Sequence, residues 1–289
     1  MRGSSVPQRQ VGRNLRALRE AAGITLRAAA KRIDKAEVTV WRMETGQTPM
    51  KTPDVEVLCG FYGATPEVME ALVALTRESR AAAWWQSSKV PGVTAVYAGM
   101  EQSADHISTY EDSLIPGLFQ TADYTAAVIR SHRPELPTEE VERRVAFRLT
   151  RQAILTRRLP PFAFSVVLSE TAVRTPMGGP DMMATQLAHI VYVSRLPGIS
   201  VRMIPLGAGP HPGLYSGNFV ILRFPATPGG AIHEPTTVFV ESFAGSWYHD
   251  KPFEVRQYEE AFEGILSAAL DEDATRQALA DAAKGYKES

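Results

Sequence analysis

The 289-residue chain is 44% hydrophobic and 22% charged, which excludes a disordered protein and indicates about two folded domains. It has no run of about 20 apolar residues, no signal-peptide core and one cysteine, Cys59; these features exclude a membrane span, an internal disulfide and a cysteine-based zinc site. Residues 1–50 hold 10 basic and 4 acidic residues, a charge of +6, which leaves −7 for the rest of the chain. A basic module on an acidic body is typical of local contact with phosphates, and we expect a cytoplasmic protein.

The first 80 residues are predicted to form five short helices joined by tight turns. Val11, Leu15 and Leu18 lie at helical spacing, and Gly23 is placed to end the first helix. Thr25 has a side chain suited to capping the second helix. The expected helices are residues 11–22, 26–33, 36–43, 52–61 and 65–80. This all-α domain of residues 1–82 is expected to be followed by an irregular linker over residues 83–98.

Residues 99–289 are predicted to form an α+β domain with a small, mostly antiparallel sheet flanked by helices. Strands are expected where β-branched and aromatic residues are bounded by Gly, Pro or Ser, at residues 163–168, 199–204, 218–224 and 237–241. Helices are expected at about 100–112, 121–131, 138–157, 181–196, 252–270 and 273–285, with Thr138 capping the third. Most strands lie in the middle of this region, which favours an α+β domain over a strictly alternating parallel sheet.

Residues 25–46 have the pattern of a helix-turn-helix. Ala29 and Ala30 are small enough for two helices to cross closely, and a buried seam is expected at Ile33, Val40 and Met43. The outward face of the second helix is then left with Glu37, Val38, Trp41 and Arg42. The basic residues placed to approach a DNA backbone are Arg27, Lys31 and Lys35. A plain helical bundle with a solvated charged face is the alternative, but the spacing, the +6 charge and the five helices favour DNA binding.

The chain resembles the Cro/cI-type helix-turn-helix family from about Val11 to Gly63, most clearly in the run VWRMETG of residues 40–46. The resemblance places base-reading positions on Glu37, Val38 and Arg42. It places phosphate contacts near Leu26, Arg27, Thr45 and Gln47. Two residues depart from the family pattern: Ala36 stands where a capping Ser or Thr is common, and Leu26 where a polar phosphate contact is common.

The same resemblance implies an ion pair between Arg19, near the end of the first helix, and Glu44, just beyond the seam residue Met43. This pair would tie the first helix to the recognition helix. We expect it to be partly buried.

Residues 99–289 contain no evident catalytic or cofactor-binding constellation. The six histidines have no metal-ligand spacing, and the glycines indicate turns rather than a phosphate-binding loop. Glu170 and Glu241 are considered as an acid–base pair, although carboxylates so far apart in sequence usually lie on the surface. His211, in the loop GAGPHPG, is the most site-like histidine, and a loop residue without a function is the simpler interpretation. We therefore expect no metal, no cofactor and no enzyme activity.

Whole phrases of this region nevertheless resemble one family: LIPGLFQTADY (114–124), RLTRQAIL (148–155), VRMIP (201–205), GNF (217–219) and VFVES (238–242). It is a set of regulators from high-GC antibiotic-producing bacteria that join a Cro/cI-type helix-turn-helix to a C-terminal domain of unknown function. The resemblance implies an antitoxin-like regulator encoded beside a small partner protein. From the residues alone, Arg148, Arg151 and Gln152 could bind an anion or serve a structural role.

The sequence thus predicts a transcriptional regulator that binds a double-stranded DNA operator through residues 9–63, as a homodimer, and is controlled through a partner-binding C-terminal domain. The aromatic residues expected at protein interfaces are Trp84, Trp85, Tyr215, Trp247 and Tyr248. Two alternatives stay open: an enzyme with a catalytic C-terminal domain fused to a DNA-binding module, and an antitoxin that mainly binds a small protein.

Overall fold

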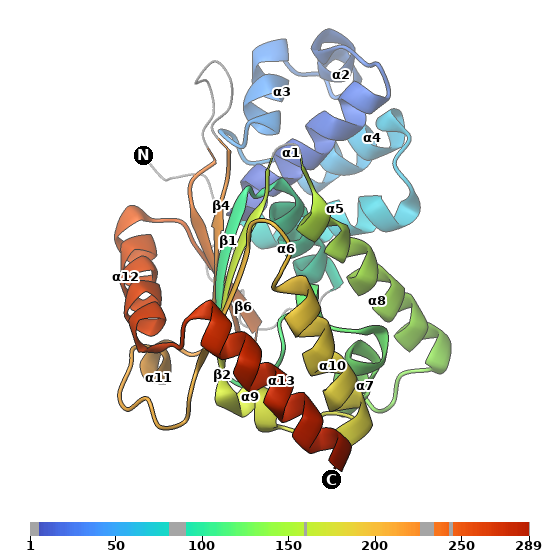
Figure 1. Ribbon diagram of the computed structural model, residues 1–289. Coiled ribbons are helices and arrows are strands. Elements are labelled where there is room, and N and C mark those ends of the chain that lie inside the picture. Colours follow the sequence, from blue (N-terminus) through green and yellow to red (C-terminus); the bar gives the residue numbers. More distant parts are fainter. Residues whose placement is uncertain (1–5, 81–90, 159–160, 226–233, 243–244, 289) are drawn as a thin grey trace. The chain divides into compact units, whose positions relative to one another are not determined.

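The computed structural model describes residues 6–80, 91–158, 161–225, 234–242 and 245–288 (Figure 1). The chain forms two compact units: of the described residues, the first contains 6–80, 91–103, 241–242 and 245–248, and the second contains 104–158, 161–225, 234–240 and 249–288. Among the helices of these described ranges, none is long and apolar enough to cross a membrane.

The first unit is mainly helical. Its helices are α1 (Val6–Ala21), α2 (Leu26–Arg32), α3 (Glu37–Glu44), α4 (Thr52–Tyr62), α5 (Pro66–Arg80) and α6 (Pro91–Ser103). The five helices expected over the first 80 residues are confirmed to within a few residues at each end, apart from an earlier start of α1. Helix α1 packs against α3, α4 and α5, and its side chains Val11 and Leu15 are fully buried.

The remaining elements follow α6 in the chain. The strands are β1 (His106–Glu111), β2 (Ala163–Ser169), β3 (Ile199–Ile204), β4 (Phe219–Arg223), β5 (Thr237–Ser242) and β6 (Gly245–His249). The α-helices are α7 (Ala122–His132), α8 (Thr138–Arg151), α9 (Glu170–Arg174), α10 (Pro180–Val193), α11 (Gly213–Ser216), α12 (Pro252–Ala268) and α13 (Glu272–Glu288). Two short 3-10 helices are η1 (Gly117–Phe119) and η2 (Gln152–Thr156).

The strands form one mixed sheet in the order β3-β2-β1-β4-β5-β6. Strand β1 pairs in parallel with β2, and β2 in parallel with β3, whereas β4 is antiparallel to both β1 and β5. The parallel half arises because α7 and α8 return the chain from β1 to β2, and α9 and α10 return it from β2 to β3. The α+β class is confirmed, with a sheet that is half parallel in these pairings.

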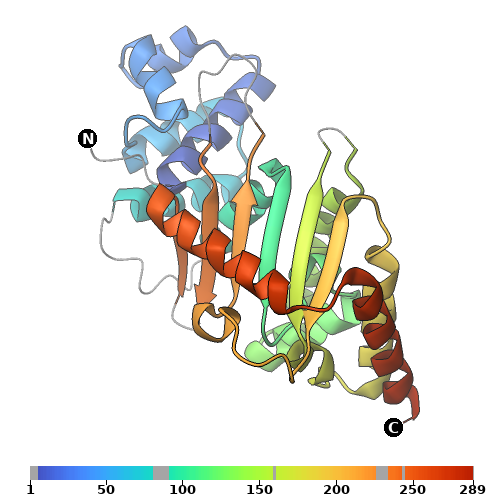
Figure 2. The same ribbon diagram turned by 60° about the vertical axis from the view of Figure 1, so that its left-hand side comes forward.

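Helices cover both faces of this sheet. Figure 2 shows α12 crossing one face, whereas Figure 1 places α7, α8, α10 and α13 on the other side. A core cluster under α12 joins Tyr110, Phe219 and Ile221 of the sheet to Phe262 and Ile265 of the helix. On the other side, α10 and α13 pack along each other, and α13 also packs on β3.

Two expected elements were wrong. The helix expected at 100–112 is instead the end of α6 followed by strand β1, with Ile107 and Tyr110 buried. Strand β1 lies in the centre of the sheet and is buried on both faces, so it lacks the alternation of an exposed strand. Its polar residues pair instead, and the Thr109 hydroxyl donates to the Phe219 carbonyl at 3.0 Å.

The second error lies in the stretch expected to be irregular. Residues 91–98 belong to α6, which begins at Pro91, a residue suited to the first helical position since it has no N–H to leave unpaired. Trp84, Trp85 and the rest of residues 83–90 lie outside the described residues. Two smaller differences remain. Strand β6 was not predicted. Helix α8 has Pro137 at its N-cap position, and Thr138 does not cap it.

Candidate nucleic-acid interface

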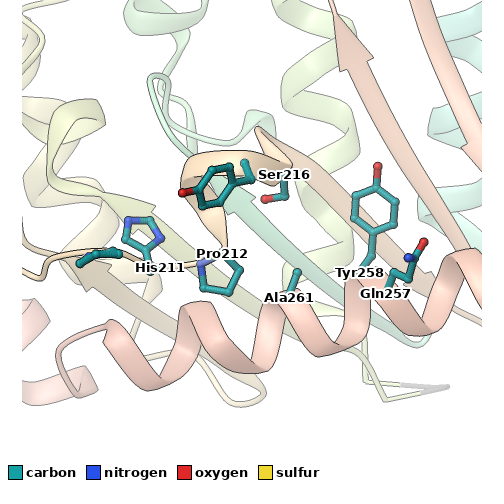
Figure 3. A pocket seen from close by; sticks show the side chains of 8 residues that line it. His211, Pro212, Ser216, Gln257, Tyr258 and Ala261 are labelled. Carbon is teal, nitrogen blue, oxygen red and sulfur yellow. The ribbon is translucent and has the colours of Figure 1, made fainter.

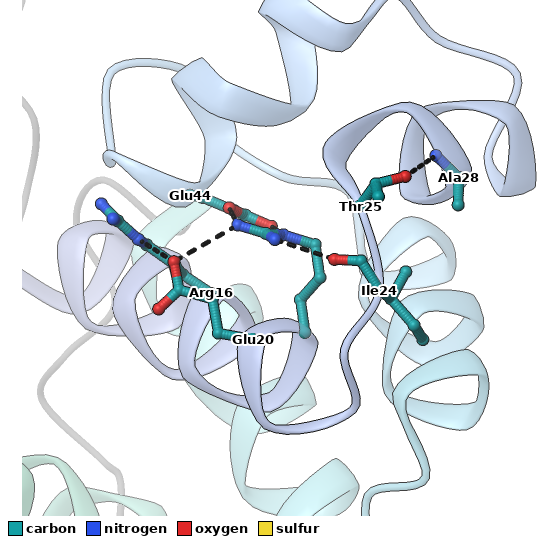
Figure 4. Close-up of polar contacts among 7 residues, drawn as sticks. Arg16, Glu20, Ile24, Thr25, Ala28 and Glu44 are labelled. Atoms are coloured by element: carbon teal, nitrogen blue, oxygen red, sulfur yellow. Dashed lines mark hydrogen bonds and ion pairs between the residues drawn. The ribbon is translucent and has the colours of Figure 1, made fainter.

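Helices α2 and α3 form a compact helix-turn-helix. Thr25 caps α2, and its hydroxyl accepts a hydrogen bond from the Ala28 amide at 3.2 Å (Figure 4). Ala29 and Ala30 are buried, which lets α3 approach closely. The turn between the helices places Asp34 in the left-handed region, with φ 51°, a conformation that Asp tolerates better than most residues. Ala36 precedes α3 without a side-chain cap.

Helix α3 is divided into an inner and an outer face. Val40 and Met43 are buried toward the rest of the first unit. The predicted outward residues are all exposed: Glu37, Val38, Trp41 and Arg42. Val38 is 52% and Trp41 39% exposed, so their apolar surface is accessible to a ligand. The face of α3 therefore offers one acid, one base and two apolar groups to a ligand.

The predicted backbone contacts surround this face, with one exception. Arg27 and Gln47 are exposed, and Thr45 is half-buried, its hydroxyl donating to the Arg42 carbonyl at 3.2 Å. Lys35 differs because its ammonium group lies 3.5 Å from an Asp54 carboxylate oxygen, and both side chains are largely covered. The structure thus ties Lys35 to α4, within the first unit.

Glycine lets α1 approach the end of α3, a feature that the sequence pattern did not reveal. A Cβ on Gly12 would lie 2.5 Å from the Met43 carbonyl oxygen and 2.6 Å from that of Glu44. The Gln8 side-chain amide, also on α1, donates to the Gly46 carbonyl at 2.6 Å. These contacts fix the angle at which α3 leaves the unit, and so they orient its outward face.

The structure brings together Arg19 and Glu44, and both are buried (Figure 4). The Arg19 guanidinium donates from Nε to Oε1 of Glu44 at 2.7 Å and from Nη2 to Oε2 at 2.9 Å. Its third nitrogen donates to the Ile24 carbonyl at 2.9 Å, so the same side chain also holds the turn that follows α1. The hydrogen bond to Glu44 is the main cause that raises the pKa of Arg19, which keeps the guanidinium charged. The pair therefore links α1, the turn after it and α3.

Cys59 lies on the buried side of α4 and is fully covered. Burial raises the pKa of its thiol to about 11, so almost none of the reactive thiolate is present at neutral pH. We expect the native protein to react with iodoacetamide at pH 8 at least a hundredfold more slowly than the chain unfolded in urea, in which the thiol pKa is about 8.5. Mass spectrometry of timed samples measures both rates. Equal rates in the two states would mean that Cys59 is accessible.

The residues considered for chemistry within residues 99–289 make separate sets of contacts. His106 contacts the Ser165 and Ser108 hydroxyls, each at 3.3 Å, whereas His249 contacts the Glu254 carboxylate at 3.1 Å. Neither histidine joins a hydroxyl to a carboxylate. Glu170 accepts hydrogen bonds from Arg174 and from the Leu206 amide, which lowers its pKa, and Glu241 is exposed near the end of β5. In the described ranges, no three His, Cys, Asp or Glu residues are grouped to hold a metal ion.

Two of the phrases singled out in the sequence meet around Gln120. The Arg148 guanidinium donates to the Gln120 side-chain oxygen at 2.7 Å, and the Gln152 amide donates to the Gln120 carbonyl at 2.7 Å. Gln120 itself is buried and donates to the Ile115 carbonyl at 2.7 Å. This network fastens the loop of residues 115–121 to α8 and η2, which is the structural role of these residues.

Two family models match different parts of the chain. A family model described as a helix-turn-helix domain matches residues 10–72, so the first unit contains a DNA-binding module of the type that regulators use. Residues 94–281, almost two thirds of the chain, match the domain of unknown function DUF5753, and the chain belongs to that family. No curated protein and no solved structure matches the chain.

Proposed function

We propose that the protein is a cytoplasmic, sequence-specific transcriptional regulator of the Cro/cI type, and that α3 enters the major groove of its operator. The observation that carries the proposal is the exposed face of α3 within the matched helix-turn-helix domain. Arg42 is the proposed guanine reader, because a guanidinium can donate two hydrogen bonds to O6 and N7. Glu37 would accept from a cytosine amine, and Val38 would contact a thymine methyl group.

The remaining predicted residues take supporting roles in this proposal. Arg27, Thr45 and Gln47 would contact phosphates, which positions α3 but carries no base information. Lys35 would contribute less, since Asp54 already neutralises it. Trp41 would cover apolar surface at the edge of the groove. The +6 charge of residues 1–50 supports binding to phosphates, whereas the −7 charge of the rest opposes it.

Replacing Arg42 with alanine is expected to relax selectivity at one base pair by about 1–3 kcal/mol. Arg27→Ala is the matched control, because loss of a phosphate contact weakens binding to all sequences alike and reduces the salt dependence. Selection from a randomised DNA library with the full chain, followed by sequencing, compares the two variants. Equal losses on every sequence for Arg42→Ala would contradict its role as a base reader.

The same selection tests the proposed homodimer. Two copies would place their recognition helices about one helical turn of DNA apart, so the selected sites should be pseudo-palindromes with half-sites about 10 base pairs apart. A single half-site without symmetry would contradict dimeric binding. This outcome is separate from the Arg42 result, which concerns base reading within each half-site.

We further propose that the DUF5753 domain controls the DNA-binding unit by binding a partner, in an antitoxin-like regulator, rather than by catalysis. Phe147 and Leu149 on α8 are 47% and 36% exposed, and they offer two separate apolar contacts on different sides of the helix to such a partner. A catalytic C-terminal domain is the less supported candidate, because His106 and His249 each bond to only half of a hydroxyl–histidine–carboxylate arrangement.

A further inference from the structure

A pocket of about 750 Å³ lies in the second unit, between α12 and the segment that leads into α11. In Figure 3, Gln257, Tyr258 and Ala261 lie along α12, and His211, Pro212 and Ser216 lie along the opposite segment. The pocket is largely open to solvent, and its volume is large enough to hold a small molecule. His211, the most site-like histidine of the sequence, thus lines a pocket whose opposite wall is formed by α12 residues more than 40 positions later in the chain.

The walls of this pocket are fixed by close packing. A Cβ on Gly213 would lie 2.6 Å from the buried Tyr110 ring, and one on Gly264 would lie 2.7 Å from the Pro212 ring. On the α12 side, the Tyr258 ring packs against the core residue Phe219, with centroids 5.1 Å apart. Gly213 and Gly264 therefore have no room for a side chain, and residues 212–213 pack closely against Tyr110 of the sheet and against α12.

No carboxylate, ammonium or guanidinium group of the described residues lines the pocket. Its hydrogen-bonding groups belong to His211, Ser216, Gln257 and the two tyrosines. His211 Nδ1 is buried without a hydrogen-bond partner and lies 2.8 Å from the position of a Cβ on Gly213, so the ring packs closely against this segment.

The exposed aromatic group at the pocket is Tyr215. Its side chain is 90% exposed. Contact with an apolar ligand would bury part of this ring and so would be favourable. With Tyr258 and Pro212 it provides flat apolar surfaces suited to a planar ring. The close-packed walls, the polar groups without carboxylates or cations, and the exposed ring all favour a small, flat, uncharged ligand.

We propose that this pocket binds an uncharged planar ring compound whose edges donate and accept hydrogen bonds. The proposal goes beyond DNA binding and does not depend on it. A charged analogue is disfavoured, because its charge would lose water without meeting an opposite charge in the pocket. Such a site makes the DUF5753 domain of this chain a receptor for a small neutral molecule.

The test uses the full chain and two isosteric probes, naphthalene-2-carboxamide and naphthalene-2-carboxylate, titrated by ligand-observed NMR. We expect saturable binding of the carboxamide and at least tenfold weaker binding of the carboxylate. Tyr215→Ala should weaken carboxamide binding at least fivefold. Tyr192→Ala is the matched control, since Tyr192 is 66% exposed on α10 and does not line the pocket. It should leave the affinity unchanged, and both tyrosines are exposed side chains outside the buried core.

Three results would overturn the proposal: no saturable binding of the carboxamide, equal affinity for both probes, or equal weakening in the two tyrosine variants. If Tyr215→Ala instead removes a co-purifying protein while the carboxamide does not bind, this surface is a protein interface and the proposal is wrong. Operator selection is unaffected by any of these results, so the DNA-binding proposal stands or fails separately.

Discussion

Replacing Gly12 with alanine is expected to lower the free energy of unfolding of the first unit by about 2 kcal/mol. The added Cβ would lie 2.5–2.6 Å from two backbone carbonyl oxygens at the end of α3, and backbone cannot turn away as a flexible side chain can. Overpacking of this kind costs up to about 3 kcal/mol, and the better helix propensity of alanine returns about 1 kcal/mol. Hydrogen exchange of α1 and α3 amides in the full chain measures the change.

Gly60→Ala is the control with the opposite sign. Gly60 lies within α4, and a Cβ there would meet no atom within 4 Å. This variant should gain up to about 1 kcal/mol, since only the helix propensity changes. If Gly12→Ala were as stable as Gly60→Ala, α1 and α3 could separate without cost, and Gly12 would not fix the orientation of α3. A shifted α3 would also weaken DNA binding in Gly12→Ala alone.

This contrast explains why the sequence indicated the recognition face but not its support. The outward position of Val38 and Trp41 follows from helical periodicity, which is local and can be read from neighbouring residues. Gly12 and Gly60 are both helical glycines, and only a contact between segments 31 residues apart distinguishes them. The pairing of Lys35 with Asp54 is likewise set by the packing of α4, so the sequence could not remove Lys35 from the set of free cations.

The second unit was predicted less completely for a related reason. Strands β2 to β5 are rich in β-branched residues and bounded by turns, and these local signals were sufficient. Strand β1 contains Ser108 and Thr109, whose hydroxyls are satisfied by Arg223 and Phe219 across the sheet. Its identity as a strand depends on neighbours more than 100 residues away. The pocket at His211 could not be predicted, because α12 supplies its other wall.

The largest single effect is expected from Glu44→Gln, about 3–5 kcal/mol of lost stability in the first unit. The substitution keeps the shape but removes the buried counter-charge of Arg19 and leaves it only the half-exposed Glu20 carboxylate at 3.6 Å; removing one partner of a buried pair costs about this much. Arg19→Met should be comparable, since it leaves the Glu44 carboxylate buried and unpaired. Urea unfolding of the full chain, monitored by hydrogen exchange of the α1 and α3 amides, measures the stability of the first unit separately from that of the second.

The double variant Arg19→Met/Glu44→Leu distinguishes the pair from its surroundings. Replacing both charges with apolar side chains of similar volume removes the desolvation cost together with the attraction, so stability should return to within about 1–2 kcal/mol of the native chain. The exposed pair Arg16–Glu20, 2.8 Å apart and about half exposed on each side, is the matched control (Figure 4). Arg16→Gln, which leaves Glu20 and its contact with Arg19 in place, should cost less than about 1 kcal/mol because water screens the exposed charges. If the double variant were as unstable as the single ones, the stability would come from the hydrogen bonds of the charged pair itself. The cost in the single variants would then not be explained by an unpaired buried charge.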